Sequence, residues 1–333
     1  MPIADTEFLY ASALLRAKEG QGIARERFER MADAQSLEEI CRLLGECGVV
    51  PVTDGEGGRF DLDRTLAAVW QDAAALVRRL SPVEGLFDYL LYPYDANDLK
   101  ACLKTAAAGE GEPEGMFFSC GTVPPADVRN AVKTKDFSAF PPAMKKAAET
   151  AAEDFARTGD PQSVDIPIDR ACFADMLAST EREPFLHSLI RLRIDLYHIR
   201  CTARTIRMGE ALPAPEAYLK RFFVPGGNIP TEELAQACGG GLPALAEVLS
   251  RHGERALAAA VENGTPETLE RACDDRLTAE LKKTKYQPFG AAVLAAYAGA
   301  AETAAKNIRI VCTMKASGLP ADLIRERLRD CYV

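Results

Sequence analysis

One pattern occurs three times in this chain, at a spacing of about a hundred residues: a basic helical segment, a glycine, and a turn that leads into another helix. The first two copies match in register at Asp95/Asp195, Leu99/Ile199, Lys100/Arg200, Lys104/Arg204, Thr105/Thr205 and Gly109/Gly209. The third copy keeps Ile308, Arg309 and Gly318 but has lost the aspartate. Self-similarity at a fixed period is typical of an architecture built by duplication. The sequence therefore predicts three related modules.

Each copy is followed by a short turn rich in glycine and proline. These turns are Gly121-Thr122-Val123-Pro124, Gly227-Asn228-Ile229-Pro230 and Gly318-Leu319-Pro320. Glycine can end a helix in the left-handed conformation, proline suits the first helical position, and acidic residues suit the positive end of the helix dipole. We expect each turn to end one module and to start the next.

The N-terminal segment contains a weaker fourth copy, in which Leu15 and Arg16 precede Gly22. The first helix therefore resembles the end of a module whose beginning lies at the C-terminus, and we expect the modules to close on themselves rather than stack as an open rod. Short Leu-Lys and Gly-Pro strings also recur by chance in helical proteins. Against chance, several positions of the first two copies match in one register.

The composition favours helices. Of the 333 residues 47% are hydrophobic but only 7% are aromatic, and no run alternates as a strand would; Val164–Ile168 is extended in character but too short to indicate a sheet. A net charge of −9 would repel nucleic acid, so we expect no nucleic-acid partner. The N-terminus has no secretion signal, and the longest uncharged apolar stretch, Phe289–Ala301, is too short to span a bilayer. We expect a soluble protein.

The chain is predicted to be all-α, with three similar helical domains at residues 1–112, 113–212 and 213–333. The joints between them have the composition of helix breakers, GEGEPEG and EALPAP, and each is followed by an aromatic pair that either packs as core or touches a partner. Predicted features within the domains are a capping box at Ser36 and Glu39, helices opened by Asp63-Arg64, Asp169-Arg170 and Glu270-Arg271, a helix at Pro142–Arg157, a loop at Thr158–Ile168, long helices at Phe87–Lys104 and Phe185–Met208, a cap at Thr265, and a final helical run to Ser317 broken near Pro288.

The usual signatures of catalysis and cofactor binding are missing from the sequence. It has no phosphate loop, no dinucleotide fingerprint, no HExxH and no GxSxG, and its three histidines, His187, His198 and His252, lack metal-ligand spacing, so we expect no catalytic residue, cofactor or metal. Ten scattered cysteines without a CxxC pair suggest reduced, buried thiols, with one structural disulfide as the alternative. The acid pairs Glu232-Glu233 and Asp274-Asp275 are expected in or near the first turns of helices, where capping and the helix dipole explain them.

The repeated cations leave two interpretations open. Lys100, Lys104, Arg200, Arg204 and Arg309 either lie on solvated faces and in ion pairs between helices, or form a shared electropositive rim that faces an acidic partner.

With the repeat laid out, the sequence resembles the C subunit of the V-type or A-type ATPase/ATP synthase, which is related to the d subunit of the eukaryotic vacuolar enzyme. The matching pieces, in order, are YASALLRA and SLEE, FDYLLYPYDANDLK, FLHSLIRLRIDLYHIR, FFVPGGNIP and NIRIV, and they span nearly the whole chain. The chain departs from the pattern where alanines flank the missing third acid and where GGGLP is inserted at Gly239.

The resemblance implies a funnel of three helical domains around a pseudo-threefold axis, with no catalysis of its own. Such a protein caps the cytoplasmic face of the membrane rotor ring, receives the central stalk, and couples ATP turnover to H⁺ or Na⁺ transport. It would be cytoplasmic, peripheral to the membrane, and without a small-molecule substrate. The residues predicted to face partners are Tyr10, Arg16, Lys100, Lys104, Arg200, Arg204 and Arg309. Small residues in FGAAVLAAYAGAA would suit either a tight core or a surface that faces the ring.

Two other classes of protein remain as alternatives. An open helical-repeat scaffold that binds peptides would have an elongated solution shape. An enzyme with an unrecognised site would have a deep pocket with strongly perturbed titrating groups.

Overall fold

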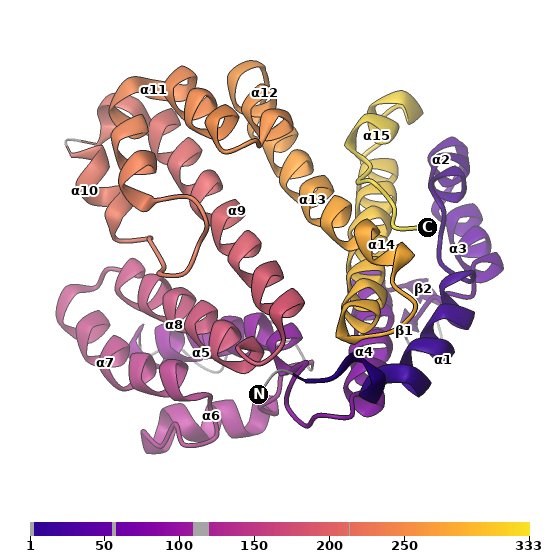
Figure 1. Ribbon diagram of the computed structural model, residues 1–333, viewed down its shortest axis with the longest axis horizontal. Helices are drawn as coiled ribbons and strands as arrows, with labels where there is room; N and C mark the ends of the chain where they lie inside the picture. Colours follow the sequence, from indigo (N-terminus) through magenta and orange to yellow (C-terminus); the bar gives the residue numbers. More distant parts are fainter. Residues whose placement is uncertain (1–2, 55–57, 109–119, 213) are drawn as a thin grey trace. The chain divides into compact units, whose positions relative to one another are not determined.

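A computed structural model of the chain describes residues 3–54, 58–108, 120–212 and 214–333. Within these residues lie fifteen α-helices and a single pair of strands, β1 (Thr53–Asp54) and β2 (Arg59–Phe60), which pair antiparallel (Figure 1). The predicted all-α fold class is confirmed. None of the described helices combines the length and the apolar character that crossing a membrane would require.

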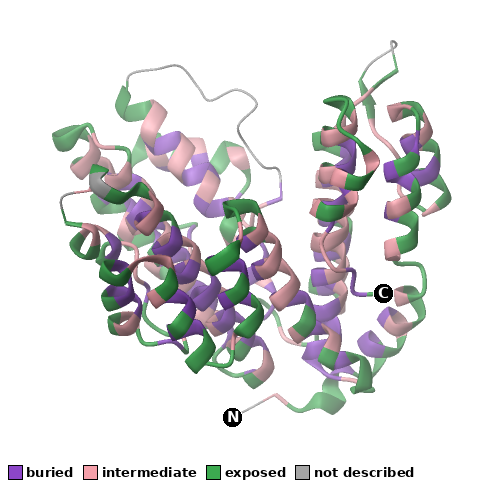
Figure 2. Ribbon diagram, turned by 90° about the horizontal axis from the view of Figure 1, so that it is seen from above, coloured by how far each residue is buried: buried purple, intermediate pink, exposed green. Residues whose placement is uncertain are grey.

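The chain divides into two compact units, Met1–Pro82 with Leu249–Val333, and Val83–Val248. In each unit the helices bury one face and expose another (Figure 2). The three predicted domains and the pseudo-threefold axis stay a prediction, and the joint between the first two domains, with Gly109 and the Phe117-Phe118 pair, lies outside the described residues.

The first unit combines the two ends of the chain. Its elements are η1 (Asp5–Phe8), α1 (Leu9–Glu19), α2 (Arg25–Asp33), α3 (Leu37–Glu46), the two strands, α4 (Leu62–Leu80), the end of α11 (Thr231–Arg251), α12 (Arg255–Asn263), α13 (Pro266–Lys282), η5 (Lys283–Tyr286), α14 (Ala291–Ala316) and α15 (Ala321–Arg327).

Helix α14 is the centre of this unit, and α1, α2, α3, α4, α13 and α15 all pack against it. Ala291–Ala296 are buried without interruption, and a methyl group added at Gly299 would collide with Leu281. The apolar stretch is therefore core, which decides between the two interpretations of FGAAVLAAYAGAA. Further along α14, Ile308 and Val311 are fully buried against α2 and α3, and burial of one such side chain stabilises the fold by about 1.5–3 kcal/mol.

The start and the end of the chain lie together in this unit. Helix α1 packs on α14, and Arg16 Nη1 donates to the Tyr332 hydroxyl over 3.2 Å. A Cβ added at Gly22 would lie 2.9 Å from Val333 Cγ2. This arrangement agrees with the expectation that the N-terminal helix completes a module begun at the C-terminus, whereas closure of the modules on themselves stays a prediction.

The second unit contains η3 (Asp88–Leu90), α5 (Tyr92–Ala108), α6 (Pro125–Thr134), α7 (Pro142–Thr158), α8 (Gln162–Thr180), α9 (Pro184–Met208), η4 (Gly209–Ala211), α10 (Pro215–Lys220) and most of α11. Helix α8 packs against α5, α7 and α9, and α5 also contacts α6 and α7. The predicted helices Pro142–Arg157 and Phe185–Met208 are confirmed. The helix predicted from Phe87 starts at Tyr92 instead, because Pro93 lacks an N–H and fits the first turn.

The loop predicted at Thr158–Ile168 is wrong, since α8 starts at Gln162 and contains Pro167. Asp160 accepts a hydrogen bond from the Gln162 N–H (3.0 Å) and so starts the helix early. Pro167 lies in the second turn, where its missing N–H removes one helical hydrogen bond. Val164 and Ile168, four residues apart on one face, are fully buried, and their burial offsets that loss.

Of the three acid–arginine pairs, one lies at the start of a helix as predicted. Asp63-Arg64 is in the first turn of α4, after the N-cap Asp61, whose side chain accepts from the Arg64 N–H. Asp169-Arg170 and Glu270-Arg271 lie inside α8 and α13.

The helix caps predicted from the sequence agree more closely with the structure. Ser36 Oγ accepts from the Glu39 N–H (3.3 Å), and the Glu39 carboxylate reaches back to the Gln35 N–H (2.8 Å), one residue before the expected partner. Thr265 caps α13, and the final run is broken before α14 as expected. The GGGLP insertion makes a kink in α11 at Gly241, where φ is 77°.

The cysteines are all free, and seven of the ten are buried, which agrees with reduced thiols in a packed interior. The aromatic pair Phe222-Phe223 packs inside the second unit, against the rings of Tyr218 and His198 respectively.

Candidate functional site

The aspartates of the first two copies hold the turns that follow them in sequence. Asp195 on α9 is 4% exposed; its Oδ1 accepts from the Asn228 N–H (2.7 Å) and the Ile229 N–H (3.0 Å), and its Oδ2 from Asn228 Nδ2 (2.7 Å). Asp95 on α5 is fully buried and accepts from the Val123 N–H (3.0 Å) and the Thr122 hydroxyl (2.6 Å). Burial raises the pKa of both carboxyl groups, and the donors act in the opposite direction.

These contacts explain the glycines at the start of the first two turns, Gly121 and Gly227, and the explanation differs from the predicted one. A Cβ at Gly227 would lie 2.5 Å from Asp195 Oδ1, and a Cβ at Gly121 would collide with Asp95. Neither glycine has a positive φ, so they permit close approach of the backbone rather than end a helix. A positive φ at the end of the repeated helix is found at Gly209 (54°), the C-cap of α9, and at Gly318 (73°), where the Leu319 N–H reaches the Met314 carbonyl.

A second repeated position also binds the backbone of a later segment through a buried polar side chain, in the second and third copies. The residues directly before Leu99, Ile199 and Ile308 are Asp98, His198 and Asn307, and all three are fully buried. Asn307 Oδ1 accepts from the Arg329 N–H (2.8 Å), and its Nδ2 donates to the Arg329 carbonyl (3.1 Å). His198 Nε2 accepts from the Val224 N–H (2.9 Å). The third copy therefore keeps a polar anchor for the following segment although it has lost the aspartate.

His198 is a packing residue in the interior of the second unit. Burial lowers its pKa to about 4, so the ring is neutral at physiological pH and its Nε2 is free to accept from the backbone. His187 is half-buried and His252 is exposed. Within the described residues, no group of three or more His, Cys, Asp or Glu side chains could hold a metal ion.

The repeated cations divide into paired and unpaired residues. On α5, Lys100 Nζ lies 2.7 Å from Asp169 Oδ1 and Lys104 Nζ lies 2.8 Å from Asp165 Oδ1, and both acids belong to α8. On α14, Arg309 Nη2 lies 2.9 Å from Asp63 Oδ1 of α4. For these three cations the interpretation as ion pairs between helices is confirmed.

Arg200 and Arg204 on α9 differ from their counterparts on α5. The Arg200 Nε donates to the Leu196 carbonyl of its own helix, and neither guanidinium forms an ion pair with a described residue. Arg204 is exposed and lines a pocket of about 420 Å³ together with Lys100, Lys104 and the carboxylates that pair with them, Asp169 and Asp165.

The two N-terminal candidates lie on α1 in opposite environments. Tyr10 is 74% exposed. Arg16 forms an ion pair with Glu19 (2.7 Å) and donates to the carbonyls of Thr284 and Gln287. Arg16 therefore joins α1 to η5 and the segment that follows it.

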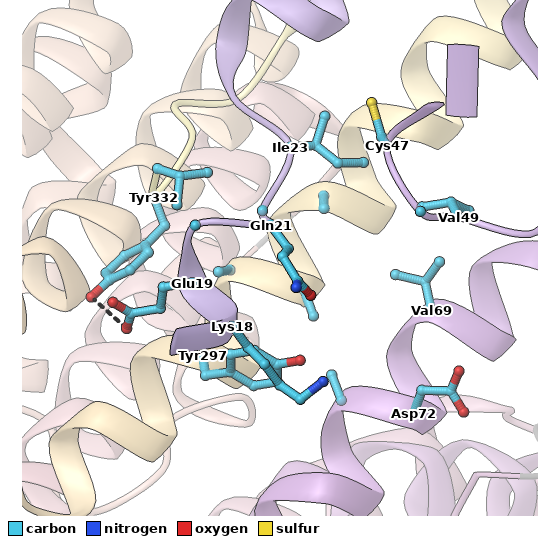
Figure 3. Close-up of a pocket in the computed structure, with 18 of the residues that line it drawn as sticks. Lys18, Glu19, Gln21, Ile23, Cys47, Val49, Val69, Asp72, Tyr297 and Tyr332 are labelled. Atoms are coloured by element: carbon cyan, nitrogen blue, oxygen red, sulfur yellow. Dashed lines mark hydrogen bonds between the residues drawn. The ribbon is translucent and has the colours of Figure 1, made fainter. Parts of the chain in front are cut away.

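A larger recess of about 640 Å³ lies in the first unit (Figure 3). Small residues of α4 and α14 form part of its lining, among them Ala68, Ala300 and Ala304, while Lys18 and Asp72 bring charges of both signs. Tyr332 and Glu19 stand side by side at one edge, and the hydroxyl donates to the carboxylate over 3.4 Å. The recess therefore combines small apolar side chains with a charged lining.

Several anchoring residues could not be found from the sequence. Asp175 on α8 accepts from the Ala143 and Met144 N–H groups and so caps α7. The expectation that Asp274-Asp275 lies in or near a first helical turn is wrong, since the pair is in the middle of α13. Asp274 pairs with Lys306 and Arg329, and Asp275 accepts from the Asp330 N–H. In each case the partner lies more than thirty residues away in the sequence. An acidic residue within a helix does not show which distant group it will contact. Glu232-Glu233 does lie in the first turn of α11 as expected.

Comparison with known proteins agrees with the repeat and the fold. The model of the ATP synthase (C/AC39) subunit family matches residues 11–327. The chain belongs to this family. It is 23% identical over 335 residues to the C subunit of the V-type sodium ATPase of Enterococcus hirae, covering 98% of this chain and 99% of that protein. It is 21% identical over 342 residues to the C subunit of the A-type ATP synthase of Pyrococcus horikoshii, covering 98% and 91%. The family assignment made from the repeat motifs is confirmed.

Proposed function

We propose that this protein is a non-catalytic central-stalk component of a V-type or A-type ATPase, coupling the rotating stalk to the membrane rotor ring. The observation that carries the proposal is the family match over residues 11–327, together with relatives named as C subunits of such enzymes that cover the chain from end to end. Its partners would be the other stalk subunits and the ring, and it would be peripheral to the membrane.

The contacts inside each unit support a mechanical role. A protein that carries torque has to resist shear between its helices. Asp95 and Asp195 hold following turns by charge-assisted hydrogen bonds, and such bonds to buried charged groups contribute more than neutral ones. Asn307 holds the C-terminal segment by two neutral hydrogen bonds between its side-chain amide and the backbone of Arg329. Each long helix is thereby tied to a segment more than twenty residues further along the chain.

Fewer residues remain as candidates for the partner interface than the sequence alone suggested. Among the described residues, Lys100, Lys104, Arg309 and Arg16 have internal partners, whereas Tyr10, Arg200 and Arg204 are not held in ion pairs. We place the partner-facing surfaces at these last three residues. Tyr10 supplies an exposed aromatic ring of the kind enriched in protein interfaces.

The proposal is tested by reconstitution of the ATPase with and without this chain. With the chain present, we expect ATP hydrolysis to drive ion uptake into sealed vesicles. Without it, hydrolysis by the head should continue while ion uptake is lost, because the stalk turns without driving the ring. Ion uptake at the full rate in the complex that lacks the chain would refute the coupling role.

A further inference from the structure

The copies of the repeat give their cations different surroundings. Lys100 and Lys104 of the first copy each bind one carboxylate of α8, and those carboxylates, Asp169 and Asp165, are four residues apart. Residues four apart lie on one face of a helix, about one turn from each other. A basic pair on one helix thus binds an acidic pair on its neighbour.

The second copy presents the same basic pair without the acidic one. Arg200 and Arg204 occupy the positions of Lys100 and Lys104 in the repeat, four residues apart on α9. Neither forms an ion pair with any residue that the structure describes. Arg204 is exposed, so its guanidinium can reach a partner without any rearrangement of the helix.

We propose that Arg200 and Arg204 bind a helix of another ATPase subunit, one that carries two carboxylates four residues apart. The inference rests on the proposed function and adds the chemistry of the partner. The occupant follows from charge complementarity: the same positions bind an acidic pair of this spacing on α8, and Arg309 of the third copy binds Asp63 on α4. Arginine in place of lysine adds a planar, forked donor that can bind a carboxylate through two hydrogen bonds.

The position of the pair on α9 favours this role. Both arginines lie in the C-terminal half of α9, which ends at Met208, and their spacing of four residues puts them on one face of the helix. An incoming acidic helix would meet two guanidinium groups, and repulsion would disfavour a basic segment. Charges at such a surface govern specificity and the rate of association more than the final affinity.

The experiment uses the full-length chain and purified stalk and ring subunits of the same ATPase. The variant is R200E/R204E, and the matched control is K145E/K146E, which makes the same change in net charge on exposed residues of α7 in the same unit. We expect R200E/R204E to bind the purified subunits at least about tenfold more weakly at low salt, with the difference shrinking as salt is raised, and K145E/K146E to bind as the wild type does. Thermal unfolding by circular dichroism checks that both variants are folded.

A photoreactive p-benzoylphenylalanine at position 204 identifies what the pair touches. We expect cross-links to a helix of another subunit with Asp or Glu at positions four apart, and reversal of those two acids to Lys should restore binding of R200E/R204E. Cross-links only within the chain itself, or only to lipid from phosphatidylglycerol vesicles, would overturn the inference.

The outcomes separate this inference from the proposed function. If the wild type binds the stalk and ring subunits and R200E/R204E binds equally well, the arginine pair has no such role while the coupling function stands. If the wild type itself fails to bind them, the proposed function is wrong and the inference falls with it.

Discussion

Replacement of Asp195 by alanine tests whether the buried aspartates hold the fold together. The carboxylate accepts two backbone N–H groups, those of Asn228 and Ile229, and one side-chain amide. The amide belongs to Asn228, which is exposed, so in the variant it returns to water at little cost. The two backbone donors would lose a charged acceptor in a site that is 4% exposed.

The magnitude follows from those two donors. A hydrogen bond to a charged group is worth about 1.5–3 kcal/mol, and the burial that raises the pKa of Asp195 shows that the carboxylate itself is partly desolvated, which favours the lower figure. Asp195→Ala should therefore lower the free energy of unfolding by about 3 kcal/mol. For a domain of the size of the second unit, that loss corresponds to a fall in Tm of about 6–12 °C.

The assay is urea unfolding followed by circular dichroism at neutral pH, with calorimetry to separate the transitions of the two units. Glu153→Ala, an exposed acid on α7 in the same unit, is the control and should change stability by less than about 0.5 kcal/mol. Asp195→Asn, which keeps one acceptor, should fall between the two. If Asp195→Ala proves no more destabilising than Glu153→Ala, the aspartate does not anchor the turn and the mechanical argument loses its support.

Three further predictions concern the neighbouring contacts. Burial lowers the pKa of His198 to about 4 from an unfolded value near 6.5, so the unfolded chain binds the extra proton first as the pH falls. The free energy of unfolding should be at its full value above pH 6.5 and should fall by about 3 kcal/mol down to pH 4. His198→Gln, compared with the wild type by urea titration at each pH, should remove that dependence. Gly227→Ala should cost about 1–3 kcal/mol in the same titration, because its methyl group meets Asp195 at 2.5 Å; a neutral result would mean that the turn can move away freely. Lys100→Met should cost less than about 1 kcal/mol, since its ion pair with Asp169 is partly exposed; a larger loss of Tm, insensitive to salt, would contradict this.

The fold class could be read from the sequence because its signal is distributed over many residues. Helical periodicity, the absence of strand-like alternation and the repeated Asp–Leu–Lys register all indicate helices, and no single position decides the outcome. The prediction of where α8 starts depended on fewer residues. Pro167 suggests a loop, and only the burial of Val164 and Ile168 shows that tertiary packing overrides the proline.

The candidate site was only partly visible for a related reason. The sequence showed that Asp95 and Asp195 recur and that Gly121 and Gly227 recur, but not that each aspartate binds the backbone beside its glycine, since the two members are more than twenty residues apart. In a single sequence a glycine required for close approach looks the same as a glycine that ends a helix.

The energies of these contacts suggest a division of labour between the two sets of repeated residues. A buried carboxylate that binds backbone donors cannot be lost without leaving those donors unpaired, so Asp195 is constrained by the fold itself. A largely exposed pair such as Arg309 and Asp63 contributes little to stability, and its members can change without loss of the fold. The repeat can therefore keep its cations in one register while their partners differ, internal for Lys100 and, as we propose, on another subunit for Arg204. A duplicated fold gains a binding surface in this way at little cost to its stability.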